Sequence, residues 1–364
     1  MNTPYSSQAK ISFAVIGSAW RAEFFFRVAK ALPERFEVCG IVTRSEEKGK
    51  SLEREWGIPT FRTVADLLKH TAPAFVVVCV PASAAPGFIA ELAENGVPVL
   101  TETPPADHPE ALNRLNKLVF QGAKIQVAEQ LHLQPMRFAQ LAVANSGKLG
   151  EIHETQISIC HGYHAVSLLR LFLNVGFRNC IVRAREFRSP VVEGPGRAGG
   201  PLREHVIQSC QTLAELDFGD KLGLYDFDGE QYFSWIRSTG LWVRGVKGQI
   251  KDANVKYLKD YRTPIDCDLK RLNAGEDGNL EGYYLKGILL GEDWIYRNPY
   301  APARLTDDEI AVASALDRMS GFLSGGSELY SLADASQDYY LSTVIQRAVE
   351  TGEAVPTQSQ VWAV

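Results

Sequence analysis

The sequence has no long apolar run, no strong excess of charge and no clustered cysteines. No apolar run reaches the roughly 20 residues that a membrane-spanning helix needs. The formal net charge of −5 over 364 residues gives no reason to propose a nucleic acid or a membrane surface as partner. The N-terminal MNTPYSSQAK is polar and lacks the apolar segment of a secretory signal. Hydrophobic residues make up 45% of the chain, which is ordinary for a globular protein.

The cysteines do not form a recognisable pattern. They are scattered and lie mostly in apolar, strand-like segments, at Cys39, Cys79, Cys160, Cys180, Cys210 and Cys267. None is paired at the spacing of a metal site, so they are interpreted as buried free thiols in a reducing compartment. This makes a cytoplasmic location the expectation. His161 and His164 have no carboxylate beside them, and no metal site is predicted.

The most informative stretch is Ile11–Phe25, ISFAVIGSAWRAEFF. Its β-branched and aromatic start suits a buried strand, and apolar residues at helical spacing follow. Between them, the small residues Gly17, Ser18 and Ala19 form a turn that points the start of the helix at an anion. Gly17, Ala19 and Ala22 occupy the three positions of the dinucleotide motif G-x-G-x-x-G/A, so only its first glycine is present.

Strands and helices then alternate as far as Gln130. The expected strands are Phe36–Thr43, Ile58–Phe61, Ala74–Pro81, Val97–Thr101 and Ile125–Gln130, and the expected helices are Trp20–Leu32, Ser45–Trp56, Val64–His70, Ala85–Asn95 and Pro109–Gln121. This alternation predicts a parallel, doubly wound α/β sheet, in which the turn after the first strand binds a dinucleotide. We therefore expect an NAD(P)-binding Rossmann domain at residues 1–130.

The end of the second expected strand bears on the choice between NAD and NADP. An acidic residue at this position binds the ribose 2′-hydroxyl of NAD, whereas this chain has Thr43, Arg44 and Ser45. Hydroxyl groups and a guanidinium suit a 2′-phosphate, so the sequence favours NADP. NAD, with Arg44 as a solvated loop residue, stays open.

Beyond Pro135 the pattern changes to successive strands. Strands are expected at Glu151–Ile159, Cys180–Phe187, Gln208–Phe218, Leu222–Phe227, Gln231–Ile236, Leu241–Val246 and Gln249–Tyr257, and helices at Gln134–Gly147, His161–Phe172, Thr306–Leu323 and Leu332–Thr351. This predicts an α+β domain at residues 131–364 with a large, mainly antiparallel open sheet. The Pro/Gly-rich Arg188–Arg203 is expected to be a long loop that contacts ligand or a neighbouring subunit.

Four stretches carry motifs of one family. They are Val76–Pro81 with Asn95–Pro104, Gly147–Ile152, Gly162–Leu169 and Arg244–Ile250. These are similar to the "GkhVlcEKP", "G.iGei", "GxHxxDll" and "yGtkGsl" motifs of the Gfo/Idh/MocA family of sugar-related oxidoreductases. The resemblance implies NAD(P)-dependent hydride transfer to or from a sugar, polyol or related cyclic substrate. It also implies a homodimer or homotetramer.

The resemblance implies residue roles as well. In the family, the lysine of the EKP motif, an aspartate and a histidine surround the reacting carbinol. Here these positions hold Thr103, Cys160 and His164. His164 is therefore the expected proton relay, since histidine titrates near neutral pH, with His161 and Tyr163 beside it.

The residues expected to bind the cofactor lie at the ends of the predicted strands and in the turns that follow them. They are Gly17, Ser18, Ala19, Trp20, Arg21, Thr43, Arg44, Ser45, Val80, Pro81, Glu102, Thr103 and Gln130. His132, shortly after Gln130, is a further candidate for facing nicotinamide or substrate.

The altered motif leaves three other functions open. Some relatives retain NAD and oxidise a sugar transiently, which lets them hydrolyse or eliminate a glycosidic bond without net redox change. Thr103 and the pair His161-Gly162 resemble those relatives. Thiazolinyl imide reductases are relatives with a displaced EKP motif. The last alternative is a cofactor-binding sensor or assembly subunit without catalysis, because the lysine and the aspartate are both missing.

Overall fold

The computed structural model describes residues 10–275, 279 and 282–363, and its contacts divide the chain into two compact units. Unit 1 comprises Met1–Pro135, Leu272–Gly287 and Arg297–Ser336, and unit 2 comprises Met136–Arg271, Ile288–Tyr296 and Gln337–Val364. The expected domains are consecutive, whereas these units are discontinuous. Division into folding domains at residue 130 stays a prediction. The segment before Lys10, expected to carry no secretory signal, lies outside the described residues.

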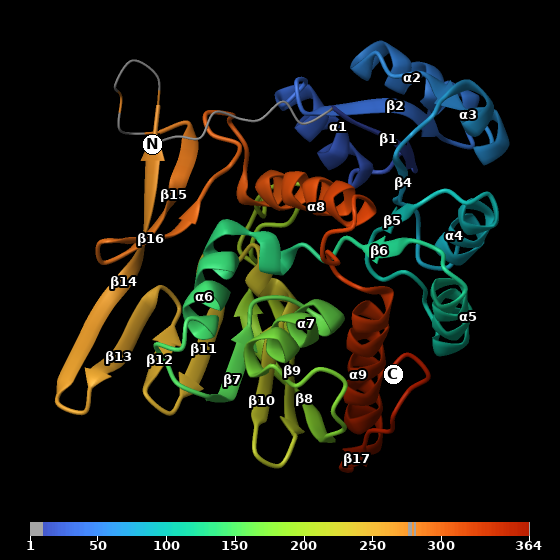
Figure 1. Cartoon of the computed structure of the whole chain (residues 1–364). Helices are drawn as coiled ribbons and strands as arrows, with labels where there is room; N and C mark the ends of the chain where they lie inside the picture. Colours follow the sequence, from blue (N-terminus) through green and yellow to red (C-terminus); the bar gives the residue numbers. More distant parts are fainter. Residues whose placement is uncertain (1–9, 276–278, 280–281, 364) are drawn as a thin grey trace. The chain divides into compact units, whose positions relative to one another are not determined.

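Unit 1 contains a parallel sheet whose described strands run in the order β3-β2-β1-β4-β5-β6 (Figure 1). The strands are β1 (Ile11–Ile16), β2 (Phe36–Val42), β3 (Thr60–Phe61), β4 (Phe75–Val78), β5 (Val99–Thr101) and β6 (Ile125–Val127). Strand β1 pairs in parallel with β2 on one side and with β4 on the other. The chain order reverses between β1 and β4, which is where doubly wound sheets bind dinucleotides. The predicted Rossmann topology is confirmed.

Helices alternate with these strands. They are α1 (Ala22–Ala31), α2 (Glu46–Trp56), α3 (Val64–His70), α4 (Ala85–Glu94) and α5 (Pro109–Phe120). The hydroxyl of Ser45 accepts the Lys48 amide at the start of α2, and the hydroxyl of Thr63 accepts the Asp66 amide at the start of α3. Such caps fix where a helix begins because they satisfy its first N–H groups. The expected helix from Trp20 begins only at Ala22.

A late segment of the chain completes unit 1. Helix α8 (Asp307–Leu323) follows a capping box at Thr306 and packs against α1. Arg27 Nε lies 2.7 Å from a carboxylate oxygen of Glu309 in α8. Arg35 likewise pairs with Asp317, at 2.7 Å. A short 3₁₀ helix, η1 (Leu131–Leu133), follows β6.

Unit 2 contains most of a second sheet, whose described strands run in the order β16-β15-β14-β13-β12-β11-β7-β10-β9-β8-β17. The strands are β7 (Ile152–Ser158), β8 (Ile181–Val192), β9 (Val206–Asp217), β10 (Leu222–Asp228), β11 (Gly240–Gly245), β12 (Gly248–Lys251), β13 (Asn254–Asp260), β14 (Thr263–Ala274), β15 (Tyr284–Leu290), β16 (Asp293–Arg297) and β17 (Val355–Pro356). Strand β10 is parallel to β7 and antiparallel to β9. The predicted large, mainly antiparallel sheet is confirmed, although β14, β15 and β16 are strands that the sequence analysis missed.

Three helices lie wholly or mostly in unit 2. They are α6 (Pro135–Asn145), α7 (Gly162–Leu173) and α9 (Leu332–Thr351). Helix α7 packs on β7 and β10. Gly223 of β10 makes room for it, since a Cβ there would lie 2.6 Å from a methyl carbon of Leu169.

Three expectations about unit 2 are wrong. The expected strand at Gln231–Ile236 begins instead as a 3₁₀ helix, η2 (Gly229–Tyr232), because Asp228 caps it through a capping box. The expected strand at Gln249–Tyr257 is the hairpin of β12 and β13, whose turn includes Asp252 at a φ of 53°.

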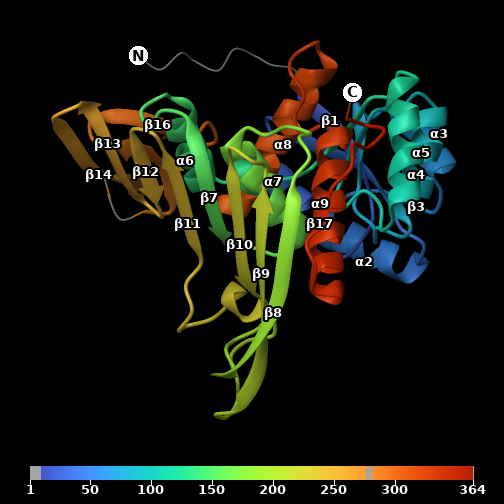
Figure 2. The same cartoon turned by 90° about the horizontal axis from the view of Figure 1, so that it is seen from below.

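The third concerns Arg188–Arg203, expected to be a loop throughout. Its first residues extend β8, which pairs with β9 from Ile181 to Val192. Figure 2 shows this long hairpin. Backbone pairing with β9 outweighs the low strand propensity of Pro190, whose partner is Gln208.

The expectation of buried cysteines holds only in part. Cys79, Cys160 and Cys180 are buried, whereas Cys210 is exposed and Cys39 and Cys267 are half-buried. The three less buried thiols lie within β2, β9 and β14, where every second side chain of a strand points to the opposite face.

Candidate functional site

The turn between β1 and α1 requires glycine at its first position. Gly17 has a φ of 129°, and a Cβ there would lie 2.1 Å from the carbonyl oxygen of Cys79. The Gly17 amide donates to the carbonyl of Val42 at 3.0 Å. The turn is thus held between the ends of β2 and β4. Position 17 of the motif therefore requires glycine. Position 19 is exposed in the turn, so alanine is compatible with it.

The start of α1 lacks a side-chain cap. The N-cap residue of α1 is Arg21, and among the described residues no side chain caps this helix by accepting a hydrogen bond from its first N–H groups. By contrast, the side chains of Ser45, Thr63 and Thr306 cap their helices. The first N–H groups of a helix favour an anion, and a pyrophosphate is such a partner. Together with the side-chain-free Gly17, this arrangement fits a dinucleotide.

Two predicted cofactor residues meet at the ends of neighbouring strands. The Thr43 hydroxyl donates to the Ser18 hydroxyl at 3.2 Å, and Thr43 is buried. Arg44 is exposed. The Ser45 hydroxyl is used by α2, where it accepts the Lys48 amide at 3.2 Å. Contacts of these residues with a cofactor stay predictions.

Glu102 brings together residues from three separate segments. Its Oε1 atom accepts a hydrogen bond from Arg21 Nε at 3.0 Å and one from Gln130 Nε2 at 3.0 Å. Glu102 follows β5, Arg21 precedes α1, and Gln130 follows β6. The Glu102 side chain is only 11% exposed, so solvent screens its ion pair with Arg21 less than it would a surface pair.

The other predicted cofactor residues lie at the same edge of the sheet. Val80 and Pro81 follow β4, and Thr103 follows β5 and is joined to Pro104 by a cis peptide bond. Trp20 is 51% exposed, and its ring lies edge-on to Phe24 at 5.7 Å. The carboxyl ends of parallel strands form the ligand-binding edge of such sheets.

Arg62 is a residue that the sequence analysis missed. Its Nη1 donates to the carbonyl of Thr43 and to that of Phe61, both at 3.1 Å. A second guanidinium therefore lies at the end of β2, where it contacts Thr43, the residue that precedes Arg44. Its position one residue after β3, the neighbour of β2, is the signal that could have pointed to it.

His132 lies in the protein interior and is less suited to catalysis. Burial lowers the pKa of its imidazole to about 4. Its ring lies 5.4 Å from that of Tyr330. A neutral, packed histidine is a core residue rather than a proton relay at neutral pH.

The three predicted catalytic residues lie together in unit 2. His161 is the N-cap of α7, and its ring centroid lies 5.2 Å from that of His164 and 5.6 Å from that of Tyr163. The rings of Tyr163 and His164 are 4.4 Å apart. The start of α7 thus gathers two imidazoles and a phenol, a set of groups able to donate and accept protons.

Two further tyrosines, not predicted, contact the start of α7. The Tyr232 hydroxyl accepts the His161 amide at 3.0 Å and also contacts Nδ1 of the same residue. The Tyr225 hydroxyl accepts the Gly162 amide at 3.1 Å. Burial raises the pKa of Tyr225 to about 12, so this phenol stays protonated. No sequence motif marks them, since they come from β10 and η2.

Two kinds of feature are absent from the described residues. No group of three or more His, Cys, Asp or Glu side chains in that part of the chain could hold a metal ion. Likewise, none of the helices described is long and apolar enough to cross a membrane.

The first part of the chain matches a known protein family. Residues 11–129 match the model of the GFO_IDH_MocA family, described as an oxidoreductase family with an NAD-binding Rossmann fold. No curated protein matches the chain.

Solved structures share the fold over nearly the whole chain. An oxidoreductase from Agrobacterium radiobacter in complex with NAD+, L-tartaric acid and magnesium has a TM-score of 0.68 at 16% identity, over 95% of this chain and 98% of that one. The WlbA dehydrogenase from Bordetella pertussis, in complex with NADH and UDP-GlcNAcA, has a TM-score of 0.63 at 15% identity, over 97% and 100%. A putative myo-inositol dehydrogenase from Sinorhizobium meliloti has a TM-score of 0.66 at 14% identity, over 95% and 99%.

The family match covers the parts of unit 1 that form the candidate cofactor site. It includes the Gly17 turn, the ends of β2 and β4, and Glu102. The family that residues 11–129 match is thus the one that the sequence motifs resemble, the Gfo/Idh/MocA oxidoreductases with their NAD-binding Rossmann fold.

Proposed function

We propose that this protein is an NAD(P)-dependent oxidoreductase that transfers hydride to or from a sugar, polyol or related cyclic substrate. The observation that carries the proposal is the Gly17 turn at the reversal of strand order, in a domain that matches an NAD-binding family. The substrate class is supported by structural relatives described with UDP-GlcNAcA and as a putative myo-inositol dehydrogenase.

The candidate residues of unit 1 would hold the cofactor. The turn at Gly17, Ser18 and Ala19, with the uncapped start of α1, would bind the pyrophosphate. Thr43 and Arg44 would bind the adenosine ribose, with a preference for a 2′-phosphate. NAD(P), when bound, supplies the acceptor or donor of the hydride.

His164 is proposed as the proton relay. Oxidation of a carbinol requires removal of its hydroxyl proton, and reduction of a carbonyl requires delivery of one. A neutral imidazole accepts a proton and an imidazolium donates it, and both forms are accessible near neutral pH. His161 and Tyr163 are proposed to orient the substrate beside it, because their rings contact that of His164.

A test without added cofactor separates this proposal from the alternatives. Purified protein is denatured, and any released nucleotide is identified by mass spectrometry. Empty protein that binds added NADPH or NADH supports an ordinary dehydrogenase or reductase. Stoichiometric retained NAD supports a redox-neutral glycosidase or lyase. Protein that neither retains nor binds a nucleotide contradicts both enzymatic functions.

A turnover assay then tests the relay. The absorbance of reduced nicotinamide follows turnover with a panel of polyols, aldoses and nucleotide sugars. On a substrate found in this way, His164→Ala is expected to lower kcat about 10²–10⁴-fold, the usual contribution of a general acid–base. His153→Ala, at an exposed position of β7, is the matched control. Unchanged turnover in His164→Ala would remove this mechanism.

Assembly and location are also proposals. Family resemblance favours a homodimer or homotetramer, which light scattering of the purified chain would measure. A cytoplasmic location is expected from the cysteine pattern of the sequence alone.

A further inference from the structure

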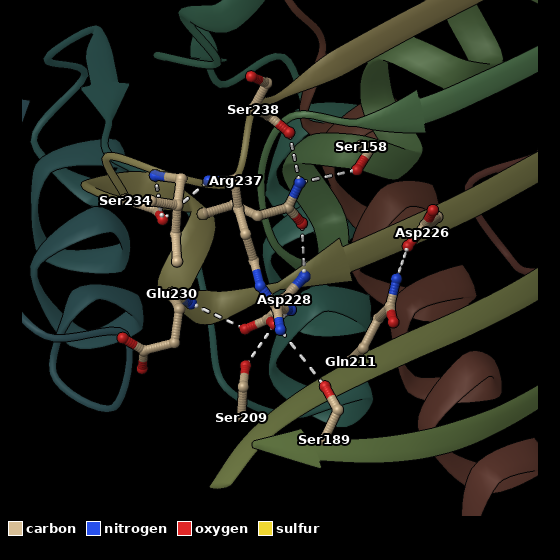
Figure 3. Close-up of polar contacts among 12 residues, drawn as sticks. Ser158, Ser189, Ser209, Gln211, Asp226, Asp228, Glu230, Ser234, Arg237 and Ser238 are labelled. Atoms are coloured by element: carbon tan, nitrogen blue, oxygen red, sulfur yellow. Dashed lines mark hydrogen bonds and ion pairs between the residues drawn. The ribbon is translucent and has the colours of Figure 1, made fainter. Parts of the chain in front are cut away.

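A buried carboxylate lies at the end of β10, outside the candidate sites described above. Asp228 is 1% exposed. Its carboxylate accepts hydrogen bonds from Ser209 and from Arg237, and from the Glu230 amide at 3.0 Å. Figure 3 shows these contacts converging on Asp228 from β9 and from the segment after β10. Such a fully partnered buried carboxylate fixes its surroundings in one arrangement.

The contacts of Asp228 hold both ends of residues 229–239, here called the η2 loop. At its start, the Asp228 amide donates to Gln231 Oε1 at 2.9 Å. At its end, Arg237 reaches back to Asp228 and also donates to the Ser189 hydroxyl at 3.3 Å. The side chain of Gln231 joins the two ends of the loop, since its Nε2 donates to the backbone carbonyl of Ser238 at 2.8 Å.

The η2 loop passes from one face of the sheet to the other. Tyr225 and Asp228 are three residues apart in β10, so their side chains lie on opposite faces. Tyr225 contacts α7, and Asp228 therefore points to the face away from α7. Tyr232, within the loop, packs on Phe227 at 4.9 Å between ring centroids, on the α7 face.

At that face, Tyr232 contacts His161 at two atoms. Its hydroxyl oxygen accepts the His161 amide N–H at 3.0 Å and also contacts Nδ1 of the His161 ring. Because the backbone amide can only donate, the phenol oxygen accepts there and its own proton can be given to Nδ1. A ring that accepts at Nδ1 carries its proton at Nε2.

We infer that Tyr232 fixes the Nε2–H tautomer of His161, and that the Asp228–Arg237 pair is a clamp that holds Tyr232 in place. Asp228, Arg237 and Tyr232 are thus positioning residues. His161 then presents an N–H donor suited to a hydroxyl or carbonyl oxygen. This role in substrate orientation rests on the proposed function, whereas the tautomer itself does not.

The tautomer is measured directly by nuclear magnetic resonance of protein labelled with ¹⁵N in its histidine rings. The chain has seven histidines, and the His161 signals are those that disappear in His161→Gln. The ionisable groups that contact this region include Tyr163, His164, Tyr232 and, through Gly162, Tyr225. At a pH at which the ring is neutral, the wild-type protein is expected to show a protonated Nε2 and an unprotonated Nδ1.

Tyr232→Phe tests the contact without disturbing a buried group, because Tyr232 is 44% exposed. The variant is expected to lose the preference for Nε2–H, which shifts both ring nitrogen signals. Tyr261→Phe, at a position 79% exposed, is the control and should leave them unchanged. A wild-type Nδ1–H tautomer, or unchanged signals in Tyr232→Phe, would overturn the inference.

The clamp is tested by Asp228→Asn and Arg237→Lys. Both are expected to shift the His161 signals in the same direction as Tyr232→Phe. Should Asp228→Asn fail to fold, Arg237→Lys decides, because its side chain is 27% exposed and a single ammonium cannot reproduce the guanidinium's fork of donors. Asp226→Asn, on the same face of β10 and bonded to Gln211, is the matched control.

Unchanged His161 signals in the folded clamp variants, or an equal shift in Asp226→Asn, would refute the clamp. The measurement needs neither cofactor nor substrate. A protein with the expected tautomer but no nucleotide binding would contradict the proposed function alone. A protein with turnover but the other tautomer would contradict this inference alone.

Discussion

Replacing Gly17 by alanine should destabilise unit 1 and weaken cofactor binding together. The new Cβ would lie 2.1 Å from the Cys79 carbonyl oxygen, so the two backbone segments must separate by more than about 1 Å to reach ordinary contact. The φ of 129° adds about 1–3 kcal/mol of backbone strain. Overpacking against backbone adds about 1–3 kcal/mol. A total loss of about 2–6 kcal/mol is expected.

Gly57→Ala separates the two contributions. Gly57 also has a positive φ, of 70°, but a Cβ there meets nothing within 4 Å. Only the conformational cost of about 1–2 kcal/mol applies. Thermal unfolding followed by circular dichroism should place Gly17→Ala about 4–8 °C below Gly57→Ala, since 1 kcal/mol shifts Tm by about 2–4 °C in a unit of this size.

Cofactor binding supplies the second readout for the pair. Isothermal titration with NADPH and NADH should show weakened binding only for Gly17→Ala, because its distortion reaches the turn that is proposed to hold the pyrophosphate. Equal stability of the two variants would refute the packing argument. Equal cofactor affinity would refute the assignment of this turn as the cofactor site.

Three further outcomes are expected. Asp338→Ala should lower the free energy of unfolding by denaturant by about 3–5 kcal/mol, because it leaves Arg170 charged at a position 4% exposed. Glu215→Ala removes one partner of an exposed ion pair and should lower it by less than about 1 kcal/mol. Similar losses in the two variants would contradict this. Burial lowers the pKa of His132 from its ordinary value of 6.5 to about 4 in the folded protein. His132 therefore stays neutral in the folded protein while the unfolded chain gains a proton, so wild-type stability should fall as pH drops from 6.5 to 4. His132→Gln should remove up to about 3 kcal/mol of that fall, and an unchanged pH profile would contradict the assignment. Glu102→Gln should weaken cofactor binding about tenfold in the same titrations, because it removes the charge that holds Arg21 at the start of α1, and unchanged affinity would contradict this.

Local patterns were sufficient where one physical preference dominates. Val64–His70 and Leu332–Thr351 are helices over the predicted bounds, because caps and apolar spacing mark their ends. The Rossmann order followed from strands alternating with helices, since parallel strands need crossovers. By contrast, Gln231–Ile236 has strand-like alternation, but the capping box of Asp228 directs the chain into η2.

The candidate sites show the same division. The sequence determined that the chain carries a dinucleotide turn at Gly17 and two histidines at the start of one helix, because these signals lie within a few consecutive residues. Only the tertiary structure decided that Glu102 joins Arg21 to Gln130, and that Tyr232 contacts His161. Those contacts join residues far apart in the sequence. They depend on the pairing and register of whole strands, which no short pattern of residues specifies.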